Sequence, residues 1–277
     1  MDLKTLKETP SWEWPQGADT MLLRILRDDQ SDASDRLLAA ELAGDFVVMN
    51  DGLADALLAI VERSEETEEL RGEAAISLGT ALEHADTMGF EDAGDILVTE
   101  QVFRRIKESL RALYLDADVP KEVRRRILEA SVRAAQDWHH DAVHAAYFED
   151  DEAWRLTAVF CMRFVRGFDD QILEALDSTN PDIHYQAVCA AGNWEVDGAW
   201  PHIAALVTSE ETDKPLLLAA IEAAASIRPH DAPIILADLI DSDDEDIGDA
   251  ALEALAMAEG RSALEDFDEE NGDGFLH

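Results

Sequence analysis

A ten-residue pattern recurs seven times along the chain, and it constrains the fold more than any other feature. All copies but the first start with an apolar residue, often followed by Arg, and the copies have small residues at about the fourth and fifth places. The copies begin at residues 35, 70, 123, 154, 183, 216 and 247. A period near 31 residues corresponds to two short helices and their turns. The chain is therefore expected to be a stack of helical hairpins, in which the small residues let neighbouring helices approach closely.

Composition and turn residues predict that every copy belongs to a helix. Ala, Leu and Glu dominate the sequence, whereas its 277 residues include only 14 Gly and 8 Pro, which favours an all-α chain. A second amphipathic stretch precedes several copies, for example at Leu53–Arg63 and Asp170–Asp177. The turn between the two stretches supplies residues that cap helix N-termini well. The expected N-caps are Asp32, Thr67, Asp151, Asn180, Asp213 and Asp244.

The repeats also set the expected domain boundaries. Residues 18–263 are predicted to form a single solenoid. Residues 1–17, which include two Trp, are expected to cover its open end, as capping segments do. The longest step between copies leaves an insert at about residues 84–99. Residues 264–277 are acidic and are expected to form a frayed tail.

The pattern apolar-Arg-x-x-Ala-Ala-x-x-Leu-Gly after an acidic turn resembles HEAT repeats. It resembles in particular the short bacterial and archaeal type that is also called phycobilisome-lyase-like. The resemblance implies a right-handed α-α superhelix of about seven helical hairpins, and it implies a protein that binds other proteins. It is strongest in the copies Trp154–Arg163, Ile183–Gly192, Leu216–Ala225 and Ile247–Ala256, good in Leu70–Gly79 and looser in Asp35–Gly44.

The same resemblance assigns a role to the second place of the pattern. In the family, an Arg at this place usually joins a ladder with Asp residues between repeats. The matching residues here are Arg36, Arg71, Arg124 and Arg155. His184, Leu217 and Gly248 stand at this place in the last three copies, so the ladder is expected to fail in the C-terminal half.

Charge excludes several classes of partner. The chain has 62 acidic and 22 basic residues, for a net charge of −40. Nucleic acid is not expected as the partner, because phosphate binding depends on Lys and Arg. An anionic membrane surface is disfavoured for the same reason. Two readings of the acidity stay open: attraction of a basic partner protein, or adaptation to a halophilic cytoplasm.

Other features of the sequence indicate a cytoplasmic protein. No uninterrupted apolar run reaches the roughly 18 residues of a membrane span. The N-terminal residues have no apolar core of the signal-peptide type. The two cysteines, Cys161 and Cys189, provide no disulfide framework.

A groove in the middle of the stack is the first candidate site. Second helices line the inner face in this family, so the third, seventh and tenth places of the pattern should face the groove. The seventh place is mostly Glu, but the fourth and fifth copies have apolar and aromatic residues instead. An isolated apolar stripe of this kind is typical of a binding hot spot. The predicted partner-binding residues are Leu156, Phe160, Arg163, Tyr185, Cys189 and Asn193. Burial of these residues between twisted repeats is the alternative.

A locally basic segment is the second candidate. The stretch from Arg104 to Arg133 is the one locally positive part of this acidic chain. It could contact an acidic partner, or it could pair internally with neighbouring acidic repeats. The residues of this basic patch are Arg104, Arg105, Arg124, Arg125 and Arg126.

The sequence lacks the common motifs for catalysis and for metal binding. The chain has no Walker-type loop, no G-x-S-x-G and no CxxC. It also lacks the His-Glu dipeptides that bind iron in one group of HEAT-like enzymes. His140 and His144 are four residues apart, but Asp141 stands where the Glu of HExxH would be and no third ligand is evident. The sequence therefore predicts no catalytic residue, no metal site and no cofactor.

The function that these observations favour is a protein-binding scaffold or adaptor. It is predicted to be non-catalytic and to engage a peptide or helix through the groove. Its acidic edge would steer a basic partner. The alternative, suggested by the lyase-like repeat type, is a lyase-like or chaperone subunit acting on a protein that carries a chromophore or cofactor.

Overall fold

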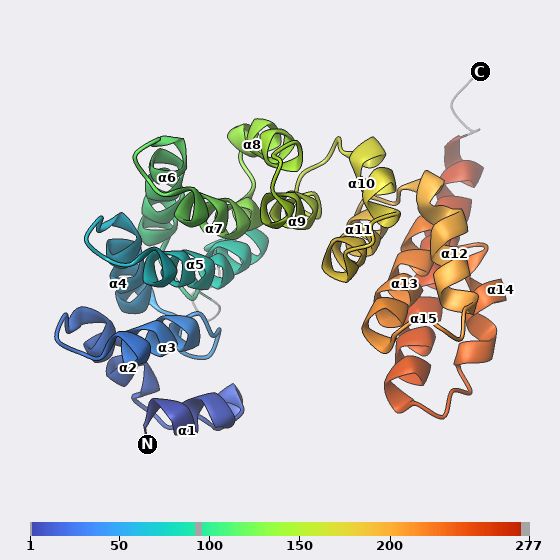
Figure 1. Cartoon of the computed structure of the whole chain (residues 1–277). Helices are drawn as coiled ribbons and strands as arrows, with labels where there is room; N and C mark the ends of the chain where they lie inside the picture. Colours follow the sequence, from blue (N-terminus) through green and yellow to red (C-terminus); the bar gives the residue numbers. More distant parts are fainter. Residues whose placement is uncertain (1, 92–95, 273–277) are drawn as a thin grey trace. The chain divides into compact units, whose positions relative to one another are not determined.

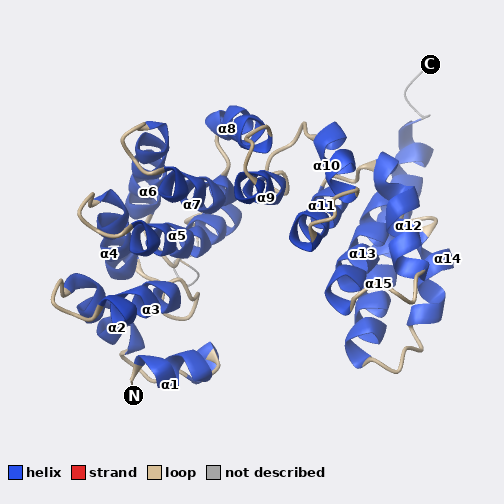
Figure 2. Cartoon of the chain, in the orientation of Figure 1, coloured by secondary structure: helices blue, strands red, loops and turns tan. Residues whose placement is uncertain are grey.

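The structure is a computed structural model that describes residues 2–91 and 96–272, with side chains described up to residue 260. Within these ranges the chain consists of helices joined by turns and contains no strand (Figure 2), which confirms the all-α prediction. Part of the predicted insert, residues 92–95, lies outside the described residues, as do residues 273–277 of the predicted tail. The chain divides into two compact units, Met1–Ala142 and Val143–His277.

Unit 1 is built from helical hairpins that follow a short N-terminal helix (Figure 1). The hairpins pair α2 with α3, α4 with α5, and α6 with α7, and the second helices α3, α5 and α7 contact one another in turn. The helices are α1 (Leu3–Glu8), α2 (Ala18–Arg27), α3 (Ala33–Ala43), α4 (Asp51–Glu62), α5 (Glu68–Met88), α6 (Glu100–Leu115) and α7 (Lys121–Ser131), and α8 (Asp137–Tyr147) contains the boundary with unit 2. Short 3-10 turns are η1 (Ser11–Glu13) and η2 (Val132–Ala134).

Unit 2 repeats the same arrangement. Helix α10 pairs with α11, α12 with α13, and α14 with α15, while α9, α11, α13 and α15 contact one another in turn. The helices are α9 (Glu152–Cys161), α10 (Asp169–Leu176), α11 (Pro181–Asn193), α12 (Trp200–Thr208), α13 (Lys214–Ile227), α14 (Ala232–Leu236) and α15 (Glu245–Gly272), with 3-10 turns η3 (Asp197–Ala199) and η4 (Ala237–Leu239). Helix α15 runs into the segment for which a frayed tail is predicted.

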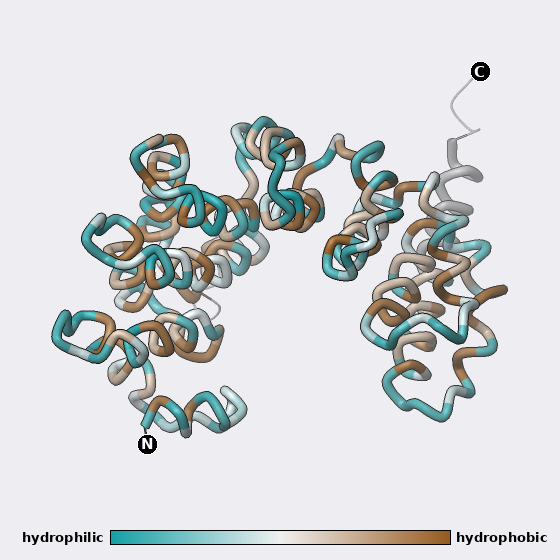
Figure 3. Tube along the Cα trace, viewed as in Figure 1, coloured by the Kyte–Doolittle hydropathy of each residue, from teal (hydrophilic) through white to brown (hydrophobic). Residues whose placement is uncertain are grey.

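The sequence pattern predicts the register of the second helices. Its seven copies lie on α3, α5, α7, α9, α11, α13 and α15, and each copy begins two residues after its helix begins. All six expected N-cap residues accept a backbone N–H from the first turn of their helix, as Thr67 does from Leu70 at 3.2 Å. Apolar and polar residues are interspersed along the described helices (Figure 3), and α2 and α6 are amphipathic, as expected of outer helices in a stack.

Small residues set the spacing between second helices. Ala74 and Ala75 of α5, and Ala187 and Val188 of α11, are completely buried. At Gly192 the approach is closer still, because a Cβ placed there would lie 2.9 Å from the Cα of Ala223 on α13. Larger residues at these places would push neighbouring repeats apart.

The N-terminal residues pack on the first hairpin. Helix α1 contacts α3, and its Leu3 and Leu6 are buried. The indole of Trp14 donates hydrogen bonds to the carbonyls of Leu6 and Thr9, whereas Trp12 is exposed. None of the described helices is long and apolar enough to cross a membrane.

The four ladder arginines do not act alike. Arg36 reaches the next acidic turn and forms two hydrogen bonds with Glu66, at 2.8 and 2.6 Å. Arg71 and Arg124 donate instead to backbone carbonyls, and Arg155 pairs with Glu174 at 2.6 Å. In the C-terminal half, Lys214 pairs with Asp244 at 2.7 Å. A tie between repeats therefore persists there, made by a residue that the pattern did not single out.

Candidate partner-binding groove

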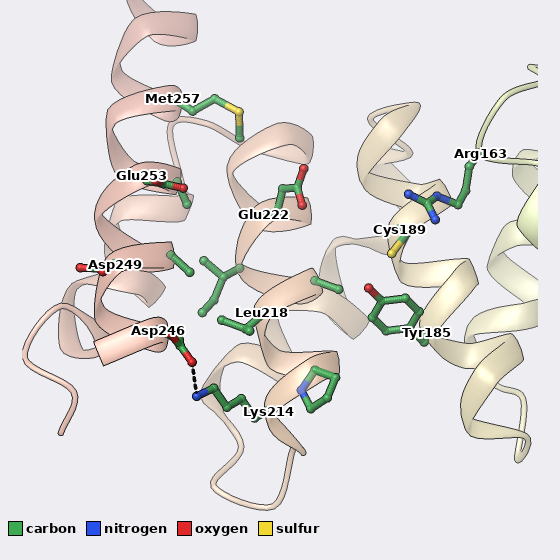
Figure 4. Close-up of a pocket in the computed structure, with 15 residues that line it drawn as sticks. Arg163, Tyr185, Cys189, Lys214, Leu218, Glu222, Asp246, Asp249, Glu253 and Met257 are labelled. Carbon is green, nitrogen blue, oxygen red and sulfur yellow. Dashed lines mark hydrogen bonds and ion pairs between the residues drawn. The ribbon is translucent and has the colours of Figure 1, made fainter. Parts of the chain in front are cut away.

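Unit 2 contains an open groove of about 770 Å³. Helices α11, α13 and α15 supply nearly all of its walls, and Arg163, just after α9, lies at one side (Figure 4). The groove is lined by Arg163, Tyr185, Cys189, Lys214, Pro215, Leu218, Ala219, Ile221, Glu222, Asp246, Asp249, Ala250, Glu253, Ala254 and Met257.

The repeat pattern explains which side chains line the groove. The third and seventh places are four residues apart, so on a helix they lie on the same face. In the last three copies these places are occupied by lining residues. They are Tyr185 and Cys189 on α11, Leu218 and Glu222 on α13, and Asp249 and Glu253 on α15.

The groove has a negative character. Glu222, Asp249 and Glu253 are exposed, and among the described residues none of them forms an ion pair or a side-chain hydrogen bond. In Figure 4 the carboxylates of Glu222 and Glu253 come from neighbouring helices, α13 and α15. Lys214 does not neutralise them, because its ammonium group is held by Asp244 and Asp246 at 2.7 and 2.6 Å. A cationic group entering the groove would therefore find carboxylates without a partner.

Arg163 is the cation at the other side of the groove. Its Nη1 donates a 3.2 Å hydrogen bond to Gln186, and its guanidinium lies over the rings of Phe160 and Phe164, 5.7 and 5.9 Å from their centroids. Its Nε is buried and has no hydrogen-bond partner within the described part of the chain. These contacts hold the guanidinium beside Tyr185 and Cys189 (Figure 4).

Tyr185 and Cys189 are neutral groups in this groove. Burial raises the pKa of the Cys189 thiol above its usual value. The neighbouring Cys189 sulfur, followed by burial, raises the pKa of Tyr185. Because nucleophilic cysteines have lowered pKa values, Cys189 is suited to packing against a ligand rather than to attacking it.

The structure brings together only part of the predicted groove set. Arg163, Tyr185 and Cys189 line the groove, while Asn193 lines a narrow adjoining cavity and donates a 3.2 Å hydrogen bond to the carbonyl of Arg163. Leu156 and Phe160 are half-buried on α9 and line neither.

Sequence reasoning missed the residues of α13 and α15. The third-and-seventh-place rule includes Leu218, Glu222, Asp249 and Glu253 when it is applied to the last two copies. An apolar stripe does not include these two copies, because their seventh place is Glu, the common residue there.

The basic patch is paired internally in unit 1. Arg104 pairs with Glu100 at 2.6 Å, and Arg105 forms an ion pair with Asp55. Arg125 and Arg126 form ion pairs with both Glu122 and Glu129, while the Nε of Arg124 donates to the carbonyl of Val119. Of these ion pairs, only Arg105–Asp55 reaches a neighbouring repeat, and those of Arg104, Arg125 and Arg126 lie within a single helix.

The histidines near the unit boundary have different environments. His139 is completely buried, stacks on Trp138 with 3.8 Å between ring centroids, and contacts the hydroxyl of Ser131 at 3.0 Å. His140 and His144 are exposed on α8. Among the described residues, no group of three or more His, Cys, Asp or Glu side chains is arranged to hold a metal ion.

Comparisons with known proteins find similarity among solved structures. No protein-family model and no curated protein matches the chain. Among solved structures, YibA of E. coli is similar, with 14% identity, 92% of this chain and 85% of that chain covered, and a TM-score of 0.49. Computationally designed armadillo repeat proteins for modular peptide recognition are also similar, with 15% identity, 86% and 98% coverage, and a TM-score of 0.35. The chain itself is an all-α stack of helical hairpins within its described residues.

One further similarity corrects a prediction about this repeat protein. Human deoxyhypusine hydroxylase, in complex with glycerol, matches with 17% identity, 93% of this chain and 88% of that chain, and a TM-score of 0.41. The sequence-based prediction that the chain is not an enzyme is therefore corrected, because a protein with an enzyme's name is among the structures similar to it. The repeat fold does not exclude catalysis.

Proposed function

We propose that the groove of unit 2 binds a basic segment of another protein. The observation that carries this proposal is the pair of unpaired carboxylates, Glu222 and Glu253, on neighbouring helices of the groove. Carboxylates arranged to attract a cationic segment increase its association rate and favour basic partners over acidic ones. The net charge of −40 acts in the same direction at longer range.

The groove also offers apolar surface between the charged groups. Leu218, Ala250 and Met257 line it together with the ring of Tyr185. Methionine side chains adapt their shape to different partners, and tyrosine is common at protein interfaces. The occupant that fits this surface is a segment in which Lys or Arg residues alternate with apolar side chains.

The test uses a short fluorescein-labelled peptide of alternating Leu and Lys, and measures its anisotropy with the full chain at low and high salt. The variant Glu222→Gln/Glu253→Gln should weaken binding roughly fivefold or more, because it removes two charge contacts. A peptide in which Ser replaces each Leu keeps the charge and should bind more weakly, since the apolar contacts are lost.

The matched control is Glu41→Gln/Glu129→Gln. These glutamates stand at the same place of the repeat in unit 1, and the variant removes the same amount of charge. It should leave peptide binding unchanged. If both double variants weaken binding equally, or the Ser peptide binds as well as the Leu peptide, the attraction is a general property of the acidic chain and the groove proposal fails.

The chromophore alternative stays a prediction that rests on the resemblance to lyase-like repeats.

A further inference from the structure

Two histidines that are distant in the sequence face each other in unit 2. His184 lies on α11 and His202 on α12, and their Nε2 atoms are 2.7 Å apart. The two rings meet edge to face, with 4.9 Å between centroids. Neither residue lines the groove. In the absence of a ligand, this geometry is that of an N–H···N hydrogen bond between two neutral imidazoles.

The surroundings keep these imidazoles neutral and place carboxylates near them. Both side chains are half-buried, and burial lowers the pKa of each. Electrostatic repulsion from His202 lowers the pKa of His184 further. Asp177, which follows α10, acts electrostatically on both rings, and Asp213, the N-cap of α13, acts on His184. Neutral imidazole is the form that binds metals.

We propose that His184 and His202 form a two-imidazole site for a divalent late transition-metal ion of the Zn²⁺ class. Zinc binds histidine nitrogen at about 2.0–2.1 Å, so a tetrahedral ion needs roughly 3.4 Å between the two nitrogens. The observed separation of 2.7 Å would have to widen by about 0.7 Å, which small rotations of the two rings supply. Water would complete the coordination, and the negative charges of Asp177 and Asp213 favour a cation at this position.

The position of the pair gives the site a structural consequence. His184 occupies the second place of its copy, where Arg36 and Arg155 make ties to a neighbouring repeat. His202 belongs to the first helix of the next hairpin. A metal ion bound by both would therefore join two successive repeats beside the groove-lining helix α11. At this repeat position, a metal bridge between the two histidines would take the place of the arginine contact that links repeats elsewhere in the chain.

The test is isothermal titration of the full chain with Zn²⁺, in buffer that contains about 5 mM Mg²⁺ to occupy carboxylates that prefer hard ions. One Zn²⁺ per chain should bind with micromolar affinity. His184→Arg and His202→Gln should each weaken this binding at least tenfold, because one of the two protein ligands is lost. His184→Arg restores the residue that the pattern has in earlier copies and is expected to fold.

The matched control is His144→Gln, which removes an exposed histidine from α8 and should leave the affinity unchanged. A second readout is the melting temperature, which Zn²⁺ should raise in the unmodified chain and in His144→Gln but not in the other two variants. Binding weaker than about 1 mM, or a loss in His144→Gln equal to that in His184→Arg, would overturn the proposal.

Discussion

The glutamates at the seventh place of the repeat form ion pairs in unit 1 but not in the described part of unit 2. Glutamate stands at the seventh place of two copies in each unit. In unit 1, Glu41 pairs with Lys7 at 3.0 Å, and Glu129 pairs with Arg126 at 3.2 Å. In unit 2, Glu222 and Glu253 form no ion pair among the described residues and line the groove. The same residue at the same repeat position can therefore have two roles. Where a Lys or Arg lies beside the glutamate it forms an ion pair, and where none does its carboxylate is available to a ligand.

Ties between successive repeats show a second difference. Arg36–Glu66 in unit 1 and Lys214–Asp244 in unit 2 both join residues 30 apart, from a second helix to the next turn. The side chains of the first pair are 9% and 12% exposed, whereas those of the second are 40% and 39% exposed. Water screens the second pair much more than the first. The Arg36–Glu66 tie of unit 1 is therefore a buried ion pair, whereas the Lys214–Asp244 tie of unit 2 is exposed to solvent.

The largest predicted effect comes from breaking the buried tie. Arg36→Leu should lower the free energy of unfolding by about 2–3 kcal/mol, because the carboxylate of Glu66 stays mostly buried without its main partner. Arg63 lies 3.7 Å from that carboxylate and compensates in part. Urea unfolding followed by circular dichroism measures the change.

Lys214→Leu is the comparison variant for this experiment. Its pair is exposed, so the loss should be far smaller than that of Arg36→Leu. Equal losses in the two variants would show that burial does not distinguish the two ties.

The buried histidine of unit 1 predicts a loss of stability in mild acid. Burial lowers the pKa of His139 to about 4 from a usual value near 6.5. The unfolded chain therefore binds a proton more readily than the folded chain, and stability falls as the pH drops from 6.5 towards 4. The expected contribution is about 2 kcal/mol lost between pH 7 and pH 5.

The difference between the unmodified chain and His139→Gln isolates this contribution. The variant should lose less stability than the unmodified chain over the same pH range, as measured by urea unfolding at each pH. Parallel pH dependence in the two proteins would contradict the assignment. His184 and His202 in unit 2 shift in the same direction, but they are only half-buried and should contribute less.

Two glycines at the tenth place of the pattern test the packing of the units. A Cβ at Gly192 would meet the backbone of Ala223 at 2.9 Å, whereas one at Gly79 would meet the flexible side chain of Arg133 at 2.8 Å. Gly192→Ala should therefore destabilise the chain by about 1 kcal/mol, since overpacking exceeds the gain in helix propensity. Gly79→Ala should be close to neutral. Thermal unfolding measures both variants, and a lower melting temperature for Gly79→Ala than for Gly192→Ala would contradict this prediction.

Much of the fold follows from the sequence for a physical reason. Each hairpin is a local unit whose register depends on its cap residue and its apolar spacing, and these are visible as the seven copies and six caps. The third-and-seventh-place rule likewise predicts which face of α11, with Tyr185 and Cys189, is turned to the groove. Such features involve residues only a few positions apart.

The rest depends on contacts between distant residues. Whether Glu129 or Glu222 has a cation beside it is decided by neighbouring helices, and the pattern is the same for both. The contact of His184 with His202 joins residues 18 apart on different helices, and no spacing rule predicts it. Leu156 and Phe160 do not line the groove, because the apolar stripe belongs to copies four and five, whereas the groove spans the last three copies.

The smallest predicted effect is the most direct test of the comparison between the units. Glu41→Gln/Glu129→Gln removes carboxylates that have partners, so it should lower the free energy of unfolding by about 0.5–1 kcal/mol at low salt. Glu222→Gln/Glu253→Gln removes carboxylates that repel their acidic surroundings, so it should leave stability unchanged or raise it by a few tenths of a kcal/mol. High salt should shrink both changes, because the screening length falls. The two variants have the same charge, so a difference in sign between them can come only from pairing. Equal losses of unfolding free energy in the two variants would mean that Glu222 and Glu253 also stabilise the fold, which would contradict their assignment as carboxylates available to a partner.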